Sequence, residues 1–295
     1  MAMSFAKRLK EVRKENGMSQ ELLAEKLGVS RQAVTKWETE KGMPDIENLI
    51  VISNLFGITV DELLSNEKET SVRKGYLFES RTEYDIDGKK RFDIKLGGAA
   101  VLKVNGTEDE KIVVHLKSNE LSGLKEDLKV KIDDIKGRID VEVKRKNSLT
   151  EAKTKELLFI EVFLPNKYLS HVELECNCGE VIFSNLVCEE IEFGGKAPKC
   201  RVDSMEGELE IDCNIDMDVL VEHLEGALAI NQVLSTSKLT VPDNFDFKTV
   251  VKGIKTLVTY ENEGEMVEDF SNKDAENVIE FNGLMSELII NSRVN

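Results

Sequence analysis

The first 65 residues carry their apolar side chains at the three- and four-residue spacing of amphipathic helices. Serine, threonine and Pro-Asp positions before these runs are typical helix starts, and glycines after them are typical helix ends. The pattern predicts four helices with the apolar faces Phe5, Leu9 and Val12; Leu23, Ala24 and Leu27; Ala33, Val34 and Trp37; and Ile46, Leu49, Ile50, Ile52 and Leu55. A short fifth helix is predicted over residues 59–64.

Residues 28–30 are all that separates the second predicted helix from the third. Two helices joined by such a short, glycine-containing turn form a helix-turn-helix unit. The apolar side of the third helix would pack against the second helix. Its opposite side carries four polar residues, Arg31, Gln32, Thr35 and Lys36. That side is either a solvated surface or a surface that contacts a partner.

The residue types on this polar side suit the edges of DNA bases. Arginine and glutamine make bidentate contacts with guanine and adenine, and lysine reaches a guanine or a phosphate. We therefore expect Arg31, Gln32, Thr35 and Lys36 to read bases. Helix starts and the flanking loops of such domains usually contact the DNA backbone, so we expect Gln20, Ser30 and Lys41 to contact phosphates.

The basic residues of the first helix are a separate group: Lys7, Arg8, Lys10, Arg13 and Lys14. Acidic residues, Glu11 and Glu15, lie within one helical turn of most of them. Most of this group is therefore expected to be solvated and paired locally, without touching DNA.

Residues 5–65 resemble the XRE family of helix-turn-helix regulators, which are relatives of phage repressor and Cro proteins. The resemblance rests on Gln20, Ala24, the run Gly28-Val29-Ser30, Val34, Trp37-Glu38, Pro44 and the DELL sequence at 61–64. It implies an all-α, five-helix DNA-binding domain over residues 1–65. It also implies a transcriptional regulator that binds double-stranded DNA. Because a single such domain binds weakly, a homodimer on an inverted repeat is expected, and repression is favoured over activation because occlusion needs no further surface. The N-terminal residues interleave Lys and Arg with Glu and lack the apolar segment of a signal peptide, so a cytoplasmic protein is expected.

Beyond a polar stretch at 66–75, which reads as a linker, the pattern changes from helical to alternating. Short runs with every second residue apolar, joined by Gly or Asp turns, predict an all-β domain over residues 76–295. Two series of apolar residues recur there at intervals of 18 to 20: Val172, Ile191, Leu209 and Leu228, and Val181, Cys200, Val219 and Leu239. Such a repeat favours a β-solenoid, and a β-sandwich is the alternative.

The stretch from about 160 to 245 also resembles a family known only as putative adhesins, which are β-solenoid domains of unassigned activity. The resemblance rests on alternating segments such as HVELECNCGEVIF at 171–183 and on turns at Gly179, Gly194-Gly195, Gly207 and Gly226. It supports the solenoid prediction and implies no activity.

Charge is distributed unevenly along the chain, which has a net charge of −16. Residues 1–41 hold nine Lys and Arg against six Glu, whereas the remaining residues hold 31 basic against 50 acidic side chains. A basic head on an acidic body suits a protein that contacts a polyanion with one end. The longest apolar stretches are too short to span a bilayer, so no membrane association is expected.

The chemistry-bearing residues suggest neither an enzyme nor a cofactor site. The three histidines, His115, His171 and His223, match no nucleophile arrangement, and no glycine loop has phosphate-binding spacing. The five cysteines lack common zinc spacing, so no metal site is predicted. Cys176, Cys200 and Cys213 are in phase with apolar neighbours and are expected to be core residues. Two alternatives stay open: a regulator that responds to a ligand, metal or redox change through its Cys-rich β domain, and a protein-interaction scaffold.

Overall fold

The computed structural model describes six segments, residues 5–15, 18–39, 41–56, 76–146, 149–262 and 264–293. The chain divides into two compact units, Met1–Gly75 and Tyr76–Asn295. The expected fifth helix at 59–64 and the expected linker at 66–75 lie outside the described residues. Within the described segments, no helix is both long enough and apolar enough to cross a membrane.

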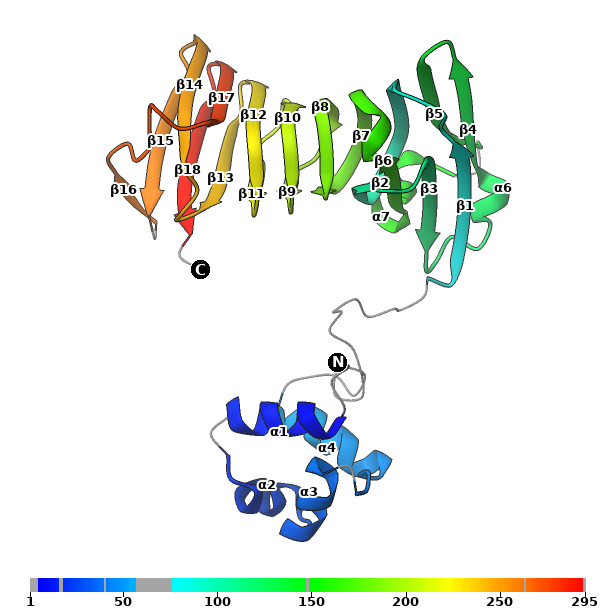
Figure 1. Cartoon of the computed structure of the whole chain (residues 1–295), viewed down its shortest axis with the longest axis vertical. Helices are drawn as coiled ribbons and strands as arrows, with labels where there is room; N and C mark the ends of the chain where they lie inside the picture. The colour runs from blue at the N-terminus through cyan, green and yellow to red at the C-terminus, as the bar shows by residue number, and fades with distance from the viewer. Residues whose placement is uncertain are drawn as a thin grey trace. The chain divides into compact units, whose positions relative to one another are not determined.

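The N-terminal unit has four helices in its described part (Figure 1): α1 (Phe5–Glu15), α2 (Gln20–Leu27), α3 (Arg31–Glu38) and α4 (Ile46–Phe56). Their apolar faces meet in one core, formed by Phe5, Leu9, Leu23, Ala24, Leu27, Val34, Trp37, Leu49 and Ile52. The existence of the first four predicted helices is therefore confirmed, and so is the inward facing of their apolar residues where the structure describes the side chains, which excludes Ile46 and Ile50.

The second unit is mostly β-structure. Its strands are β1 (Phe78–Asp85), β2 (Lys90–Thr107), β3 (Lys111–Ser118), β4 (Leu128–Ile135), β5 (Arg138–Arg145), β6 (Phe159–Pro165), β7 (Leu169–Ser184), β8 (Leu186–Lys196), β9 (Lys199–Val202), β10 (Met205–Asp212), β11 (Met217–Val221), β12 (Leu224–Val233), β13 (Thr236–Pro242), β14 (Phe247–Ile254), β15 (Leu257–Asn262), β16 (Glu265–Val267), β17 (Asn277–Leu284) and β18 (Glu287–Arg293).

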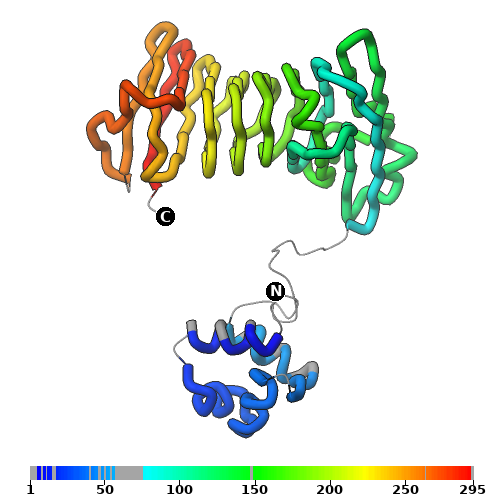
Figure 2. The backbone as a smooth tube through the Cα atoms, viewed as in Figure 1, coloured from blue at the N-terminus to red at the C-terminus, as the bar shows by residue number. Residues whose placement is uncertain are grey.

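Most of these strands stack in two parallel ladders, which Figure 2 shows as successive turns of backbone. One ladder has the order β5-β2-β7-β8-β10-β12-β17-β14. The other has the order β6-β2-β7-β9-β11-β13-β18-β15. The long strands β2 and β7 take part in both ladders. Antiparallel pairs flank the ladders: β1 with β3, β3 with β6, β4 with β5, and β15 with β16.

The predicted repeat coincides with the register of the ladders. Leu209 is paired with Ile191 on one side and with Leu228 on the other. In the second ladder Val219 is paired with Cys200 and with Leu239 in the same way. All these side chains are buried in the large core of the β unit. The spacing near 19 residues is thus confirmed as the interval between stacked strands.

The last strands leave this order. After β13 the chain forms β14 and β15 before β17 and β18, yet β17 pairs with β12 and β18 pairs with β13. The strands β14 and β15 pair on the outer sides of β17 and β18 (Figure 1). The segment 277–293 is therefore inserted between two turns that precede it in sequence, which a constant repeat does not predict.

The β unit also contains helices, so the prediction of an all-β domain is wrong in that detail. They are α6 (Leu124–Asp127), α7 (Glu151–Leu157) and the 3-10 helix η1 (Asn166–Tyr168). Thr150 caps α7, because its side chain accepts a hydrogen bond from the Lys153 N–H. The Thr-Glu start and the helix-forming residues after it were available in the sequence.

Two stacked glycines allow adjacent strands to approach closely. Gly207 has φ = 120° and Gly226 has φ = 135°, values that other residues rarely adopt. A Cβ atom on Gly207 would lie 1.7 Å from the Cys188 carbonyl oxygen, and one on Gly226 would lie 2.2 Å from that of Gly207. The close parallel pairing of β8, β10 and β12 at these positions therefore depends on glycine.

Candidate nucleic-acid interface

Capping residues fix the start of α2 and both ends of the turn between α2 and α3. Ser19 Oγ accepts a hydrogen bond from the Leu22 N–H at 3.1 Å, and Ser30 Oγ accepts one from the Ala33 N–H at 3.2 Å. Gly28 closes α2 in the left-handed conformation, with φ = 66°. The two helices are therefore joined by a short turn of defined geometry, as a helix-turn-helix unit requires.

Helix α3 has one buried side and one open side. Val34 and Trp37 are buried in the core of the N-terminal unit, at 0% and 7% exposure. On the open side Arg31, Gln32 and Lys36 are exposed, and Thr35 is half-buried. The four predicted base-reading residues thus occur together on α3, and the apolar residues Val34 and Trp37 pack the helix against the core.

Among the residues that the structure describes, no close contact holds the three exposed side chains in place. Arg31 Nη1 lies 3.9 Å from Glu21 Oε2, and both side chains are largely exposed, so this pair contributes little. The Thr35 hydroxyl lies 2.9 Å from the Arg31 carbonyl oxygen, which is the usual local contact of a helical threonine. Arg31, Gln32 and Lys36 are therefore available to an external partner.

A buried ion pair lies beneath the open side of α3. Arg13 Nε donates to Glu38 Oε1 at 2.6 Å, and Arg13 Nη2 donates to Glu38 Oε2 at 3.0 Å. The Glu38 side chain is 1% exposed and that of Arg13 is 9% exposed. Arg13 also donates to the Met18 carbonyl oxygen at 2.6 Å. This fork ties α1 and the segment before α2 to the end of α3.

The electrostatics of this pair favour the ionised forms. Burial raises the pKa of Glu38, but the hydrogen bonds from Arg13 and Gln20 outweigh it, so the net pKa is lowered. The hydrogen bond to Glu38 raises the pKa of Arg13. The expectation of local pairing within α1 is wrong for Arg13, whose partner is a buried carboxylate 25 residues away. Its position four residues after the buried Leu9 was the signal in the sequence.

The three residues expected to contact phosphates differ in the hydrogen bonds that they already make within the protein. Gln20 donates through Nε2 to Glu38 Oε2 at 2.8 Å, and its Oε1 lies 3.3 Å from the Thr35 hydroxyl. Ser30 accepts the capping bond at its oxygen, so its hydroxyl hydrogen remains available. Lys41 is exposed, and its backbone N–H donates to the Lys36 carbonyl oxygen at 2.9 Å. Gln20 is thus linked to the buried pair, whereas Lys41 is exposed and its side chain has no hydrogen bond or ion pair with another described residue.

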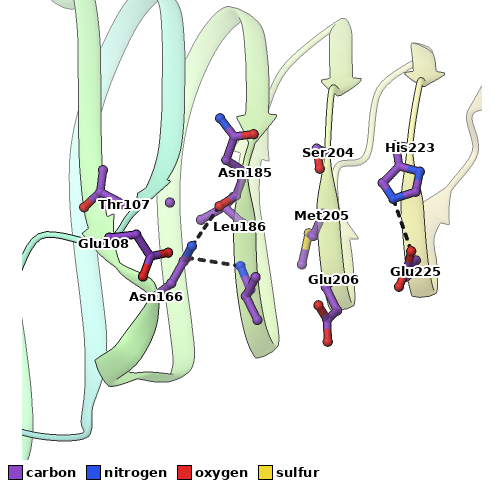
Figure 3. A pocket seen from close by; sticks show the side chains of 12 residues that line it. Thr107, Glu108, Asn166, Asn185, Leu186, Ser204, Met205, Glu206, His223 and Glu225 are labelled. Carbon is purple, nitrogen blue, oxygen red and sulfur yellow. Dashed lines mark hydrogen bonds and ion pairs between the residues drawn. The ribbon is translucent and has the colours of Figure 1, made fainter.

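The β unit has a pocket of about 490 Å³ at one corner of its stacked turns, shown in Figure 3. Asn166 faces it, but its Nδ2 donates to the Asn185 carbonyl oxygen at 3.0 Å and its Oδ1 accepts from the Val187 N–H at 3.1 Å. His223 Nε2 lies 3.4 Å from Glu225 Oε1. The Asn166 amide therefore fixes the corner turn and is not directed at a ligand.

The five cysteines, Cys176, Cys178, Cys188, Cys200 and Cys213, are unpaired and buried, as expected of core residues. Burial raises the pKa of Cys188 to about 11 and also raises the pKa of Cys200. Buried thiols with raised pKa values are poor nucleophiles and poor metal ligands. The structure therefore gives no support to sensing through these cysteines.

This environment predicts slow thiol chemistry. At neutral pH we expect Cys188, the most exposed of the five, to react with an aromatic disulfide reagent at least about tenfold more slowly than an ordinary thiol. Its pKa of about 11 in place of 9 lowers the thiolate fraction, and the greater nucleophilicity of that thiolate offsets only part of the loss. The reagent's absorbance, followed in native buffer and in denaturant, measures this rate. A rapid release equivalent to one or more thiols in native buffer would contradict it.

Residues 9–63 match the model of a family described as Helix-turn-helix. The transcriptional activator BcrR of Enterococcus faecalis is 48% identical over 66 residues, which are 22% of this chain and 32% of BcrR. The uncharacterized regulator YqaE of Bacillus subtilis is 38% identical over 68 residues, which are 23% of this chain and 59% of YqaE. The chain thus spans less than two thirds of either relative.

A solved structure described as a putative cell adhesion protein from Clostridium sporogenes is similar to 73% of this chain and 99% of its own, with 14% identity and a TM-score of 0.37. The family match, in contrast, includes the segment that holds α2, the capped turn and α3. The N-terminal unit of this chain is therefore a helix-turn-helix domain of the XRE type.

Proposed function

We propose that this protein is a transcriptional regulator that binds a specific DNA sequence through α3. The observation that carries the proposal is the exposed set Arg31, Gln32 and Lys36 on a helix anchored by Val34 and Trp37. In a helix-turn-helix domain the second helix enters the major groove with its first residues at the base edges. Arg31 and Gln32 are the first two residues of α3.

We propose distinct roles for the polar residues around this helix. Arg31 and Gln32 make bidentate base contacts, Lys36 contacts a base or phosphate, and Thr35 contacts a base edge through its methyl or hydroxyl group. Ser30 and Lys41 contact phosphates directly. Gln20 contacts a phosphate only by exchanging its bond with Glu38, which makes it the weakest of the three expected phosphate contacts.

The remaining assignments complete this proposal. The domain occupies residues 1–65, a linker follows at 66–75, and residues 76–295 form the β domain, which is a β-solenoid with two strands per turn. The protein acts in the cytoplasm, where its DNA is, as a homodimer on an inverted repeat with half-sites about 34–36 Å apart. It represses by occlusion, which requires no further surface, and the acidic β domain serves in dimerisation, sensing or partner binding.

Selection of DNA from a random pool on the full-length protein tests this function directly. We expect an enriched inverted repeat. We also expect the logarithm of the binding constant to fall by about 0.9 per contacted phosphate for each tenfold increase in salt concentration. Enrichment of a single half-site would refute the dimer. A pool that stays random would refute sequence-specific binding and favour a scaffold role. A reporter gene placed behind the selected sequence then gives the direction of regulation.

Lys41→Ala is expected to weaken binding to all sequences alike and to reduce the slope of log K against log salt by about 0.9. The reason is that Lys41 is proposed to contact a phosphate and no base. Titrations of labelled DNA at several salt concentrations measure the slope. Lys26→Ala, an exposed lysine near the end of α2, is the control and should leave the slope almost unchanged. An unaltered slope in the Lys41 variant would contradict the assignment.

A further inference from the structure

His171 lies on β7 within a group of carboxylates that stacking brings together. The parallel register pairs His171 with Glu190, and it pairs Glu173 with Glu192. Paired residues on neighbouring strands lie about 4.8 Å apart and point to the same face. The sequence conceals this cluster because His171 and Glu190 are 19 residues apart, which is one repeat.

Both nitrogens of the His171 ring face carboxylate oxygens. Nδ1 lies 2.7 Å from Glu190 Oε2, and Nε2 lies 3.3 Å from Glu173 Oε1 and 3.7 Å from Glu192 Oε1. A neutral imidazole has one N–H donor and one lone pair. One of these contacts therefore brings a lone pair against a carboxylate oxygen, an arrangement that a metal ion bound by both atoms would make favourable.

Within the described segments Glu190 and Glu192 lack the basic partner that other acidic residues of the sheet have, whereas Glu173 Oε1 lies 3.4 Å from Arg91 Nη2. Several outward-facing carboxylates elsewhere lie next to a lysine or arginine, as in the pairs Lys95–Asp93, Lys117–Glu161, Arg201–Asp203 and Lys252–Glu280. Across the described segments, no Lys or Arg nitrogen lies within 4.0 Å of a carboxylate oxygen of Glu190 or Glu192. The next strand adds Glu208 and Glu210 beside them. Stacked like charges destabilise a sheet, so a bound cation would relieve them.

The chemical types of the ligand atoms indicate which metal ions the site could bind. One ligand atom from each of His171, Glu190 and Glu192 lies within 4.8 Å of the others. One imidazole nitrogen with carboxylate oxygens suits Zn²⁺ and similar first-row divalent ions, whereas Ca²⁺ and Mg²⁺ prefer oxygen alone. The side chains come from adjacent strands of a continuous sheet, and that of His171 is only 14% exposed, so little ordering remains to be done on binding.

We propose that His171, Glu190 and Glu192 form a binding site for one divalent transition-metal ion on the β unit. Three protein ligands leave a coordination position for water or for a group from a partner. The site is independent of the DNA-binding proposal, because all its ligands come from β7 and β8.

Zn²⁺ calorimetry and Co²⁺ absorption on the metal-free, full-length chain test the site. We expect one ion per chain and visible Co²⁺ bands without the near-ultraviolet charge-transfer band of thiolate ligation. Glu192→Gln, which keeps the shape of the side chain, should weaken Zn²⁺ binding at least about tenfold, since even outer-shell changes cost 10- to 100-fold. His171→Ala should abolish it. His223→Ala is the control, because that exposed histidine lies outside the cluster, beside Glu225, and this variant should bind Zn²⁺ as the unchanged chain does.

Two results would overturn the proposal. Absence of stoichiometric Zn²⁺ or Co²⁺ binding would mean that the cluster does not hold a metal ion. Binding that survives in both His171→Ala and Glu192→Gln, or that shows the thiolate band, would assign the metal to other residues such as the cysteines. Circular dichroism of each variant establishes that its β unit is folded, and Glu192→Gln provides the test if His171→Ala is not.

Discussion

Replacing Arg31 and Gln32 by alanine is expected to lower the affinity for the selected operator by about 30-fold or more. Each bidentate base contact is worth about 1–3 kcal/mol, and 1.4 kcal/mol is a tenfold change in affinity. Both side chains are exposed and neither lies in the core, so folding should be unaffected. Competition titrations with operator and random DNA measure the loss, which should be larger for the operator.

The variant Lys41→Ala is the matched comparison, since it should weaken operator and random DNA equally. A second selection on the Arg31, Gln32 double variant should yield a degenerate motif at the positions these residues contact. If the double variant kept both the motif and the affinity, then α3 would not be the reading helix. The domain would still be of the helix-turn-helix type, but its DNA contacts would come from another surface.

Glu38→Ala is expected to reduce the free energy of unfolding of the N-terminal unit by about 3–5 kcal/mol, because it leaves the Arg13 guanidinium buried without its partner. This is a large share of the 5–15 kcal/mol that stabilises a typical domain. Trp37 is the single tryptophan of the chain and is buried in this unit. Its fluorescence during urea unfolding therefore reports on this unit alone.

Two controls separate the buried pair from a simple loss of packing. Arg13→Met combined with Glu38→Leu should recover most of the stability, since apolar side chains of similar volume replace the pair. The unchanged domain should also lose stability as the pH falls below about 4.5, the ordinary pKa of glutamate, because the pKa of Glu38 is lower in the folded state. The Met, Leu variant should lack this component. An unchanged urea midpoint in Glu38→Ala would contradict the role of the pair.

The sequence predicts the parts of this protein that depend on local spacing. The apolar faces of α1 to α4 follow a helical period, and the caps Ser19 and Ser30 mark where α2 and α3 begin. The register of Ile191, Leu209 and Leu228 follows from a spacing that is nearly constant. Each of these features needs only neighbouring residues, or a repeat of fixed length, to be recognised.

Contacts across a variable distance could not be predicted in the same way. The partner of Arg13 is on another helix, so its local acidic neighbours were misleading. The pairing of β12 with β17 skips the residues of β14 to β16, which interrupts the repeat. The polar side of α3 was predictable as a surface, but the attachment of Gln20 to Glu38 emerges only when α1, α2 and α3 are packed together.

The insertion of β17 and β18 has a consequence for the order in which the protein can be made. A ribosome delivers β14 and β15 first, at a time when the strands with which they form parallel pairs do not yet exist. Meanwhile the strands β12 and β13 present open edges to which β14 and β15 could add in simple succession. To reach the native order, β14 and β15 must either stay unpaired until β17 and β18 are made or be displaced by them. Incorrect strand pairing in a newly made chain is therefore expected at this end of the β unit.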